Sequence, residues 1–248
     1  QKGVFDLATR LYGITFKEVN NIPLYHPEVK TYEVYDNDGS FLAGLYTDFF
    51  PRESKGGGAW MTQFRGQKIV NGKDQRPLVS LVMNFTKPTD TKPSLLTFNE
   101  VTTFLHEFGH ALHGMFSKCT YGSTSMDGVS RDFVELPPQF MENFALEKEW
   151  LDTWAVHYQT GEKIPQEYID KIKKSSNFQA GYASDRQLSF GMVDMAWHTI
   201  TEPVTEPLVD FEQRAMGKTE IMPLVKGSAF SPAFGHIFAG GYAAGYYG

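Results

Sequence analysis

Two histidines spaced four residues apart could bind a metal ion. The segment His106-Glu107-Phe108-Gly109-His110 fits the pattern H-E-x-x-H. On a helix these two histidines lie about 40° apart around the axis and about 6 Å apart along it, so both imidazoles can reach one ion. Glu107 lies beside the pair, where it could hydrogen-bond a water at the metal without being a ligand. The segment therefore predicts a zinc site with Glu107 as general base.

A third ligand must come from another segment, because catalytic zinc usually has three protein ligands and a water. His113 lies about 10 Å along the helix from His106, so it is expected to pack or to support the site. Acidic residues near a helix start can also compensate the helix dipole, and spacing alone leaves the choice open. The candidates are Asp127, Asp132, Glu135 and Glu142. A histidine ligand could be oriented by a hydrogen bond to Asp132, Gln139 or Glu142, although simple exposure is the default interpretation for each.

The pattern of apolar residues predicts which elements carry these groups. Apolar residues recur at helical spacing from Phe98 onward, at Val101, Phe104, Leu105, Phe108, Leu112 and Met115. Prolines suit a first helical turn, so a second helix is predicted from Pro137 to Trp150. Further helices are predicted over residues 165–174, 178–200 and 207–216. Strands are predicted over residues 32–35, 41–46 and 78–85, the first two forming a hairpin.

These elements indicate an α+β fold that is predominantly helical. We predict one domain over residues 1–248, with a mainly β part over 1–97 and a helical part over 98–248.

The net charge of −6 argues against a nucleic-acid partner. No apolar run is long enough for a membrane helix, and no signal peptide is visible. The single cysteine allows no internal disulfide and fits a cytoplasmic location, with a periplasmic one as the alternative. The abrupt start without Met indicates a fragment.

Three segments resemble the thimet oligopeptidase and neurolysin family of zinc metallopeptidases. They are the metal motif with its neighbours (residues 104–113), the segment Arg131-Asp132-Phe133-Val134-Glu135-Leu136-Pro137, and the tail over residues 234–248. The six-residue step from His236 to Tyr242 is similar to the bacterial dipeptidyl carboxypeptidase branch. Residues 13–18, 25–27 and 57–61 resemble that branch too. The resemblance implies a zincin-type catalytic domain that holds one Zn²⁺ per chain, with Glu135 as its third ligand.

The resemblance also implies roles for the tail. His236 and Tyr242 would donate hydrogen bonds to the oxyanion, and Tyr246 would contact substrate; without the resemblance these aromatic residues would be expected simply to pack. Family members are considerably longer, with an N-terminal helical half that forms the other wall of a channel. This chain is therefore expected to pack against such a domain, as a monomer. The family pattern also continues past Gly248 with another tyrosine.

The predicted activity is hydrolysis of short peptides with release of C-terminal dipeptides. One alternative is a zinc oligo-endopeptidase that cuts internal bonds with the same chemistry. Another is a fragment that binds zinc and peptide without turnover, although a binding module would not require Glu107. The strand over residues 78–85 is a candidate sheet edge for substrate pairing. The glycines at 240–241 and within 122–128 could be hinges over the substrate or plain loops.

Overall fold

The computed structural model describes residues 1–222 and 225–248, which form two compact units. The first unit contains Gln1–Ser130 and Val134–Ile169, and the second contains Arg131–Phe133 and Asp170–Gly248. Helices and a small mixed sheet both occur, which agrees with the predicted mixture of α and β structure. That residues 1–248 act as one domain stays a prediction.

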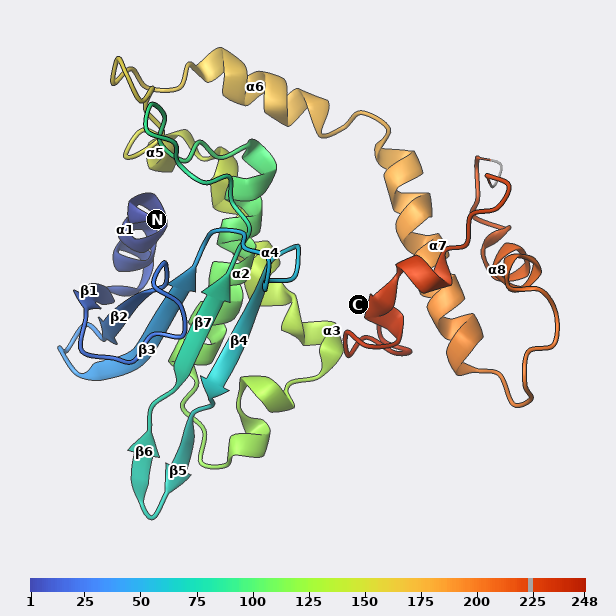
Figure 1. The fold of residues 1–248 in the computed structure, drawn as a ribbon, viewed down its shortest axis with the longest axis horizontal. Coiled ribbons are helices and arrows are strands. Elements are labelled where there is room, and N and C mark those ends of the chain that lie inside the picture. Colours follow the sequence, from blue (N-terminus) through green and yellow to red (C-terminus); the bar gives the residue numbers. More distant parts are fainter. Residues whose placement is uncertain (223–224) are drawn as a thin grey trace. The chain divides into compact units, whose positions relative to one another are not determined.

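A five-stranded sheet forms one layer of the first unit, in the order β1-β2-β3-β7-β4 (Figure 1). Strands β3 and β7 pair in parallel, and the other neighbours are antiparallel. The strands of this sheet are β1 (Thr15–Val19), β2 (Lys30–Tyr35), β3 (Phe41–Asp48), β4 (Trp60–Arg65) and β7 (Leu78–Val82). A separate hairpin consists of β5 (Lys68–Val70) and β6 (Lys73–Gln75).

Of two predictions about the strands, one is confirmed and the other is wrong. The hairpin of β2 and β3 is confirmed, with Asp36 and Gly39 closing its turn through the Gly39 N–H to Asp36 carbonyl bond of 2.9 Å. The hypothesis that residues 78–85 form a sheet edge is wrong. Strand β7 lies between β3 and β4, and β4 is the edge strand on that side of the sheet. Four of the five β7 residues are buried, as expected for an interior strand covered on both faces.

The helix α1 (Lys2–Tyr12) was not predicted within the mainly β region. Its buried residues Val4, Leu7 and Ala8 follow helical spacing and join the core. The helix ends at Gly13, which has a φ of 75° and donates its N–H to the Thr9 carbonyl. Glycine suits this left-handed position because it has no Cβ.

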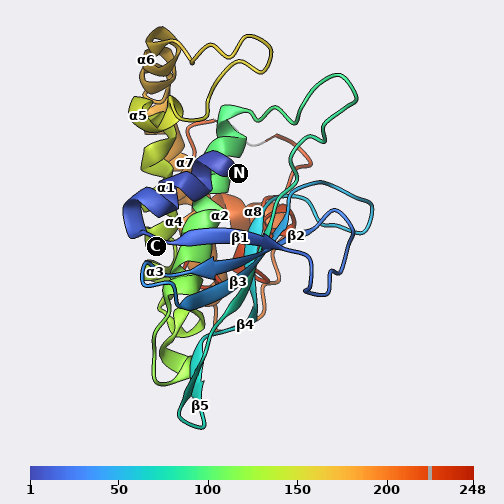
Figure 2. The same cartoon turned by 90° about the vertical axis from the view of Figure 1, so that its left-hand side faces the viewer.

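The predicted metal helix is α2 (Phe98–Phe116), which packs against one face of the sheet (Figure 2). It begins with a capping box, because Thr97 and Glu100 each bond the other's backbone N–H. Its buried face contributes Phe104, Leu105 and Phe108 to a core shared with the strands. Its apolar stripe thus fixes which face is left for His106 and His110.

The predicted helix from Pro137 to Trp150 is wrong in its extent, because the chain forms shorter pieces there. They are α3 (Arg131–Val134), α4 (Leu136–Glu142), a 3-10 turn (Asn143–Leu146) and α5 (Lys148–Leu151). The Asn143 side chain donates to the carbonyls of Gln139 and Phe140, which competes with regular helical bonding. Glu147 is extended, with a ψ of 111°, and separates the 3-10 turn from α5.

The other predicted helices are confirmed with small shifts in their ends. They are α6 (Gln166–Ser175), α7 (Ala180–His198) and α8 (Leu208–Met216). In the second unit α7 and α8 share a small core that contains Phe190, Val193, Met216 and Ile237. Across the described residues, no helix combines the length and the apolar character that a membrane crossing requires.

Candidate functional site

Three side chains of the first unit come together as a possible metal-binding group. The Nε2 atoms of His106 and His110 lie 3.1 and 3.2 Å from the same Glu135 oxygen, Oε2. One ligand atom from each residue lies within 4.8 Å of the others. Ligands bound about 2.1 Å from a tetrahedral ion would be about 3.4 Å apart. Two imidazoles and one carboxylate in this arrangement therefore fit a zinc ion.

Close packing of two helices brings Glu135 to the histidines. Glu135 immediately precedes α4, and α4 contacts α2 through Pro137 and Pro138. A Cβ on Gly109 would lie 2.5 Å from the Pro138 Cα and 2.7 Å from the Pro137 carbonyl oxygen. Because the backbones of α2 and α4 lie this close together, only a glycine fits at position 109. The fourth residue of the motif thus permits the approach of the third candidate ligand.

A second carboxylate contacts the other side of the His106 ring. His106 Nδ1 lies 2.6 Å from Glu142 Oε1, so the ring donates to Glu142 and turns Nε2 toward Glu135. Burial disfavours the charged ring, but the hydrogen bonds to Glu135 and Glu142 outweigh it and raise the pKa of His106 to about 10. A proton on this ring therefore competes with a metal ion for Nε2.

This elevated pKa predicts a pH dependence of zinc binding. His106 must lose its proton before Nε2 can bind an ion, and the ring stays protonated below a pH of about 10. The apparent zinc affinity is therefore expected to rise about tenfold per pH unit between roughly pH 7 and 9. Competition with a chelator whose own protonation is known measures this slope. An affinity that stays constant over this range would contradict the raised pKa of His106, because a ring with an ordinary pKa is already unprotonated above pH 7.

Removal of the Glu142 carboxylate is expected to weaken the metal site without destroying it. The variant Glu142→Ala should lower zinc affinity about 10- to 100-fold, because a ligand histidine loses the group that orients it. Glu149 provides a matched control, since its side chain is 83% exposed and pairs with Arg10. Glu149→Ala removes the same charge and should leave zinc affinity unchanged in the same competition assay. Equal affinities for both variants would rule out an orienting role.

Glu107 lies next to the histidine pair and is buried, with 7% of its surface exposed. Burial raises its pKa, while the charges of His106 and His110 and a hydrogen bond from the Met61 backbone oppose the rise. Met61 belongs to the edge strand β4, so the predicted base is also in contact with the sheet edge. A carboxylate with a raised pKa is suited to exchange protons with water near neutral pH.

The acidic candidates for a third ligand differ in the residues that they contact. Glu135 is the one whose oxygen lies beside both rings, and Glu142 instead contacts the far nitrogen of His106. Asp127 accepts a hydrogen bond from Gln63 at 2.8 Å, and Asp132 belongs to the second unit. Among the described residues, the group of possible metal ligands does not include His113. Glu135 and Glu142 are seven residues apart, which is two helical turns, and this spacing was a signal that both side chains point to the same side of the segment.

The tail residues of the second unit form a cluster of rings. The rings of His236 and Tyr242 are 6.0 Å apart, and the Arg131 guanidinium lies 5.1 Å from the centre of the Tyr242 ring. The Tyr246 hydroxyl donates to Gln187 at 3.0 Å, and burial raises the pKa of this tyrosine. The contacts of Tyr246 with Phe190 and Phe234 show that it also packs in the core of this unit.

A buried carboxylate that the sequence analysis missed holds the tail in place. Asp194 on α7 is fully buried and accepts the backbone N–H groups of Ala244 and Tyr246 at 2.9 and 3.1 Å. His198 Nδ1 lies 2.9 Å from the same side chain. An acid inside the otherwise apolar stretch Phe190–Trp197 was the available signal, because a buried acid must find donors.

Comparison with known proteins assigns the chain to a family. The model of peptidase family M3 matches residues 1–248. The chain is 43% identical to a dipeptidyl carboxypeptidase of Salmonella typhimurium, over 100% of this chain and 36% of that protein. It is 42% identical to oligopeptidase A of the same organism, over 99% of this chain and 36% of the relative. A thimet-like oligopeptidase of Dictyostelium discoideum is 35% identical over 99% of this chain and 37% of its own length. The chain thus spans about a third of the length of these relatives. With a matching family model over its whole length and relatives at this level of identity, the chain belongs to peptidase family M3.

Proposed function

We propose that the chain is the zincin-type catalytic part of a zinc metallopeptidase that releases dipeptides from the C-termini of short peptides. The observation that carries this proposal is the approach of the His106 and His110 Nε2 atoms to one Glu135 oxygen, with Glu107 beside them. His106, His110 and Glu135 would hold one Zn²⁺ per chain. Membership of peptidase family M3 and the name of the Salmonella dipeptidyl carboxypeptidase support the reaction.

Glu107 is assigned the proton transfers. A zinc ion bound here would lower the pKa of a water and polarise the scissile carbonyl. Glu107 accepts a proton from the attacking water at its carboxylate and then donates it to the amine that leaves. Its burial supports this role, because a raised pKa makes the carboxylate a better proton acceptor. Glu142 keeps the His106 ring in the orientation that the ligand role requires.

The tail is assigned the contacts with the substrate. His236 and Tyr242 donate hydrogen bonds to the oxygen of the scissile carbonyl as its negative charge develops, and Tyr246 contacts the peptide. The adjacency of the His236 and Tyr242 rings supports a shared task, as does the six-residue step between them. Asp194 supports these roles indirectly, because it fixes the backbone at Ala244 and Tyr246.

The edge strand β4 is assigned the binding of the substrate's peptide backbone. It pairs with β7 on one side and lies at the end of the strand order, so its other side offers N–H and C=O groups to an extended peptide. The contact between the Met61 backbone and Glu107 supports this choice over β7. A peptide paired with β4 would have its backbone close to the base.

A second candidate function is a zinc oligopeptidase that cuts internal bonds, favoured by the similar identity to oligopeptidase A. Peptides with free and amidated C-termini distinguish the two candidates when the zinc-loaded protein digests them. A dipeptidyl carboxypeptidase should release C-terminal dipeptides from the free peptide and lose much of its rate on the amide. Internal fragments from both peptides would support the oligopeptidase. Zinc binding without any product would leave only a peptide-binding role and overturn the catalytic proposal.

The rest of the polypeptide is a further proposed partner. The relatives are almost three times as long as the part matched here, and we propose that an additional helical domain packs against this chain. The digestion experiment is therefore best performed both with this chain and with the longer protein that contains it.

A further inference from the structure

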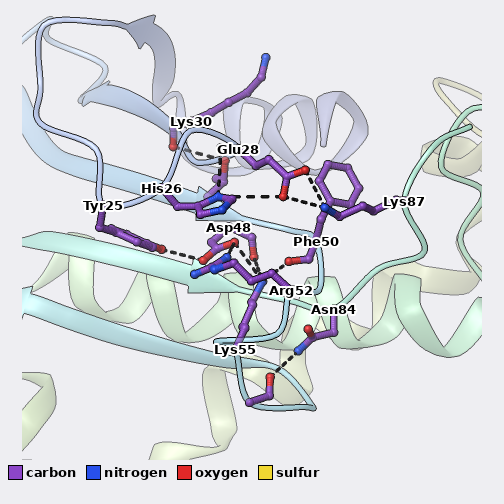
Figure 3. A network of polar contacts seen from close by, with 12 residues as sticks. Tyr25, His26, Glu28, Lys30, Asp48, Phe50, Arg52, Lys55, Asn84 and Lys87 are labelled. Atoms are coloured by element: carbon purple, nitrogen blue, oxygen red, sulfur yellow. Dashed lines mark hydrogen bonds and ion pairs between the residues drawn. The ribbon is translucent and has the colours of Figure 1, made fainter.

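A buried lysine and aspartate form the centre of a polar network on the first unit (Figure 3). The side chains of Lys55 and Asp48 are each only 2% exposed. Lys55 Nζ donates to Asp48 Oδ1 at 3.0 Å and to the carbonyls of Asp48 and Phe50, both at 2.9 Å. An ammonium group has three donors, and all three have acceptors here. Burial of this cation would be costly without such partners.

Further donors converge on the same aspartate. Arg52 Nη1 donates to Asp48 Oδ1 at 2.8 Å, and the Tyr25 hydroxyl donates to Oδ2 at 3.0 Å. Asp48 is the last residue of β3, while Arg52 and Lys55 lie in the loop that follows it. The network therefore folds the first half of the loop back onto the strand from which the loop starts.

The second half of this loop is held by a different residue. Asn84 Nδ2 donates to the carbonyls of Gly56 and Gly58, at 2.9 and 2.7 Å. These glycines belong to the run at residues 56–58, and Gly58 has a φ of 83°, which favours glycine. A run of three glycines has high conformational freedom when nothing restrains it. Lys55 at its start and Asn84 beside its carbonyls supply the restraints.

The glycine run leads directly into the strand that faces the predicted base. Strand β4 begins at Trp60, two residues after Gly58, and its next residue, Met61, lies against α2 near Gly114 and is among the groups that act on Glu107. On one side β4 is fixed by β7, with Trp60 opposite Val82. The conformation of the preceding loop therefore determines how the start of β4 lies beside Glu107.

We propose that Lys55 and Asn84 are positioning residues, which fix the loop at residues 56–58 so that the edge of β4 is ordered for pairing with an extended peptide. This inference rests on the proposed function for its kinetic consequence. The loop itself is restrained by contacts that do not depend on any substrate. Pre-ordering of a binding edge improves affinity because less conformational entropy is lost when the peptide binds.

The variants Lys55→Met and Asn84→Ala test this role. Each should raise KM for a short peptide about tenfold with a smaller change in kcat, because binding along β4 is weakened before the chemical step. Zinc content should stay at the wild-type level. Hydrogen exchange measured by mass spectrometry should accelerate over residues 56–63 and remain unchanged over α2. Asn84→Ala is the milder change and remains informative if Lys55→Met does not fold.

Lys87→Met is the matched control for Lys55→Met. Lys87 lies in the same network of Figure 3, where it pairs with Glu28 at 2.7 Å, but its side chain is 45% exposed and it does not contact the glycine run. It should change neither KM nor exchange over residues 56–63. Unchanged KM in folded, zinc-loaded Asn84→Ala would overturn the proposal, as would faster exchange that extends equally to α2. If wild-type protein does not hydrolyse peptides, the proposed function fails, and the exchange comparison still decides whether the loop is held by these residues.

Discussion

The variant Glu107→Gln is expected to lose peptide hydrolysis while it keeps its zinc. Loss of the general base should lower kcat by about 10³-fold or more, because the attacking water has no group to accept its proton. Glutamine has almost the same shape, so the buried position next to His106 and His110 should remain filled. The three candidate metal ligands themselves are unaltered. Turnover of a short peptide and elemental analysis of the same sample measure both quantities.

Glu149→Gln serves as the control for this experiment, because that side chain is exposed in α5 and is not part of the metal group. It should retain full activity and full zinc content. A Glu107→Gln variant that loses its zinc would show that Glu107 supports the metal rather than the proton transfer. A variant that keeps its turnover would remove Glu107 from the mechanism altogether.

The sequence predicts α2, the helix that carries His106 and His110, because several independent signals agree there. The apolar residues of α2 repeat with the helical period, and the residues that face away from them include His106 and His110. Thr97 and Glu100 form a capping box at its start. The hairpin of β2 and β3 is predicted for a similar reason, since strand patterns flank a short turn. Patterns of this kind lie within a short stretch of sequence, so they predict an element without reference to the rest of the chain.

The order of the strands could not be predicted from these local patterns. A run such as Leu78–Val82 indicates a strand, but its neighbours are set by the rest of the chain. In the structure four of its five residues are buried, which is typical of an interior strand and not of the predicted edge. Strand β4 is less apolar and more exposed, as an edge strand can be. Helix α1 was missed although its buried residues follow helical spacing.

Glu135, the third candidate ligand, could not be identified from spacing alone, because it lies beyond a long loop. Residues 117–130 separate α2 from α3, and 3-10 turns at Gly122–Thr124 and Met126–Gly128 shape that connection. Sequence spacing does not determine which acid returns to His106 and His110. The family resemblance selected Glu135, and the contact of Gly109 with Pro137 and Pro138 explains physically how this glutamate comes close.

Gly109→Ala is expected to disrupt the metal site although the substitution lies on a helix, where alanine is usually favourable. Alanine gains about 1 kcal/mol over glycine in helical propensity. At Gly109 the added methyl group would meet backbone atoms of Pro137 and Pro138 at 2.5 to 2.8 Å, and backbone cannot rotate away as a side chain can. Helix α4 must therefore move away from α2, which costs about 1–3 kcal/mol of the free energy of unfolding.

The same movement should weaken zinc binding, because Glu135 immediately precedes α4 and would be carried away from His106 and His110. We expect zinc affinity to fall about 100-fold, comparable to the loss of a group that supports a ligand. Gly181→Ala is the matched control, since this helical glycine of α7 has nothing within 4 Å of the added Cβ. It should be neutral or slightly stabilising in urea unfolding, with normal zinc affinity. If Gly109→Ala behaved like Gly181→Ala in both measurements, the close packing of α2 and α4 would not be what brings Glu135 to the histidines.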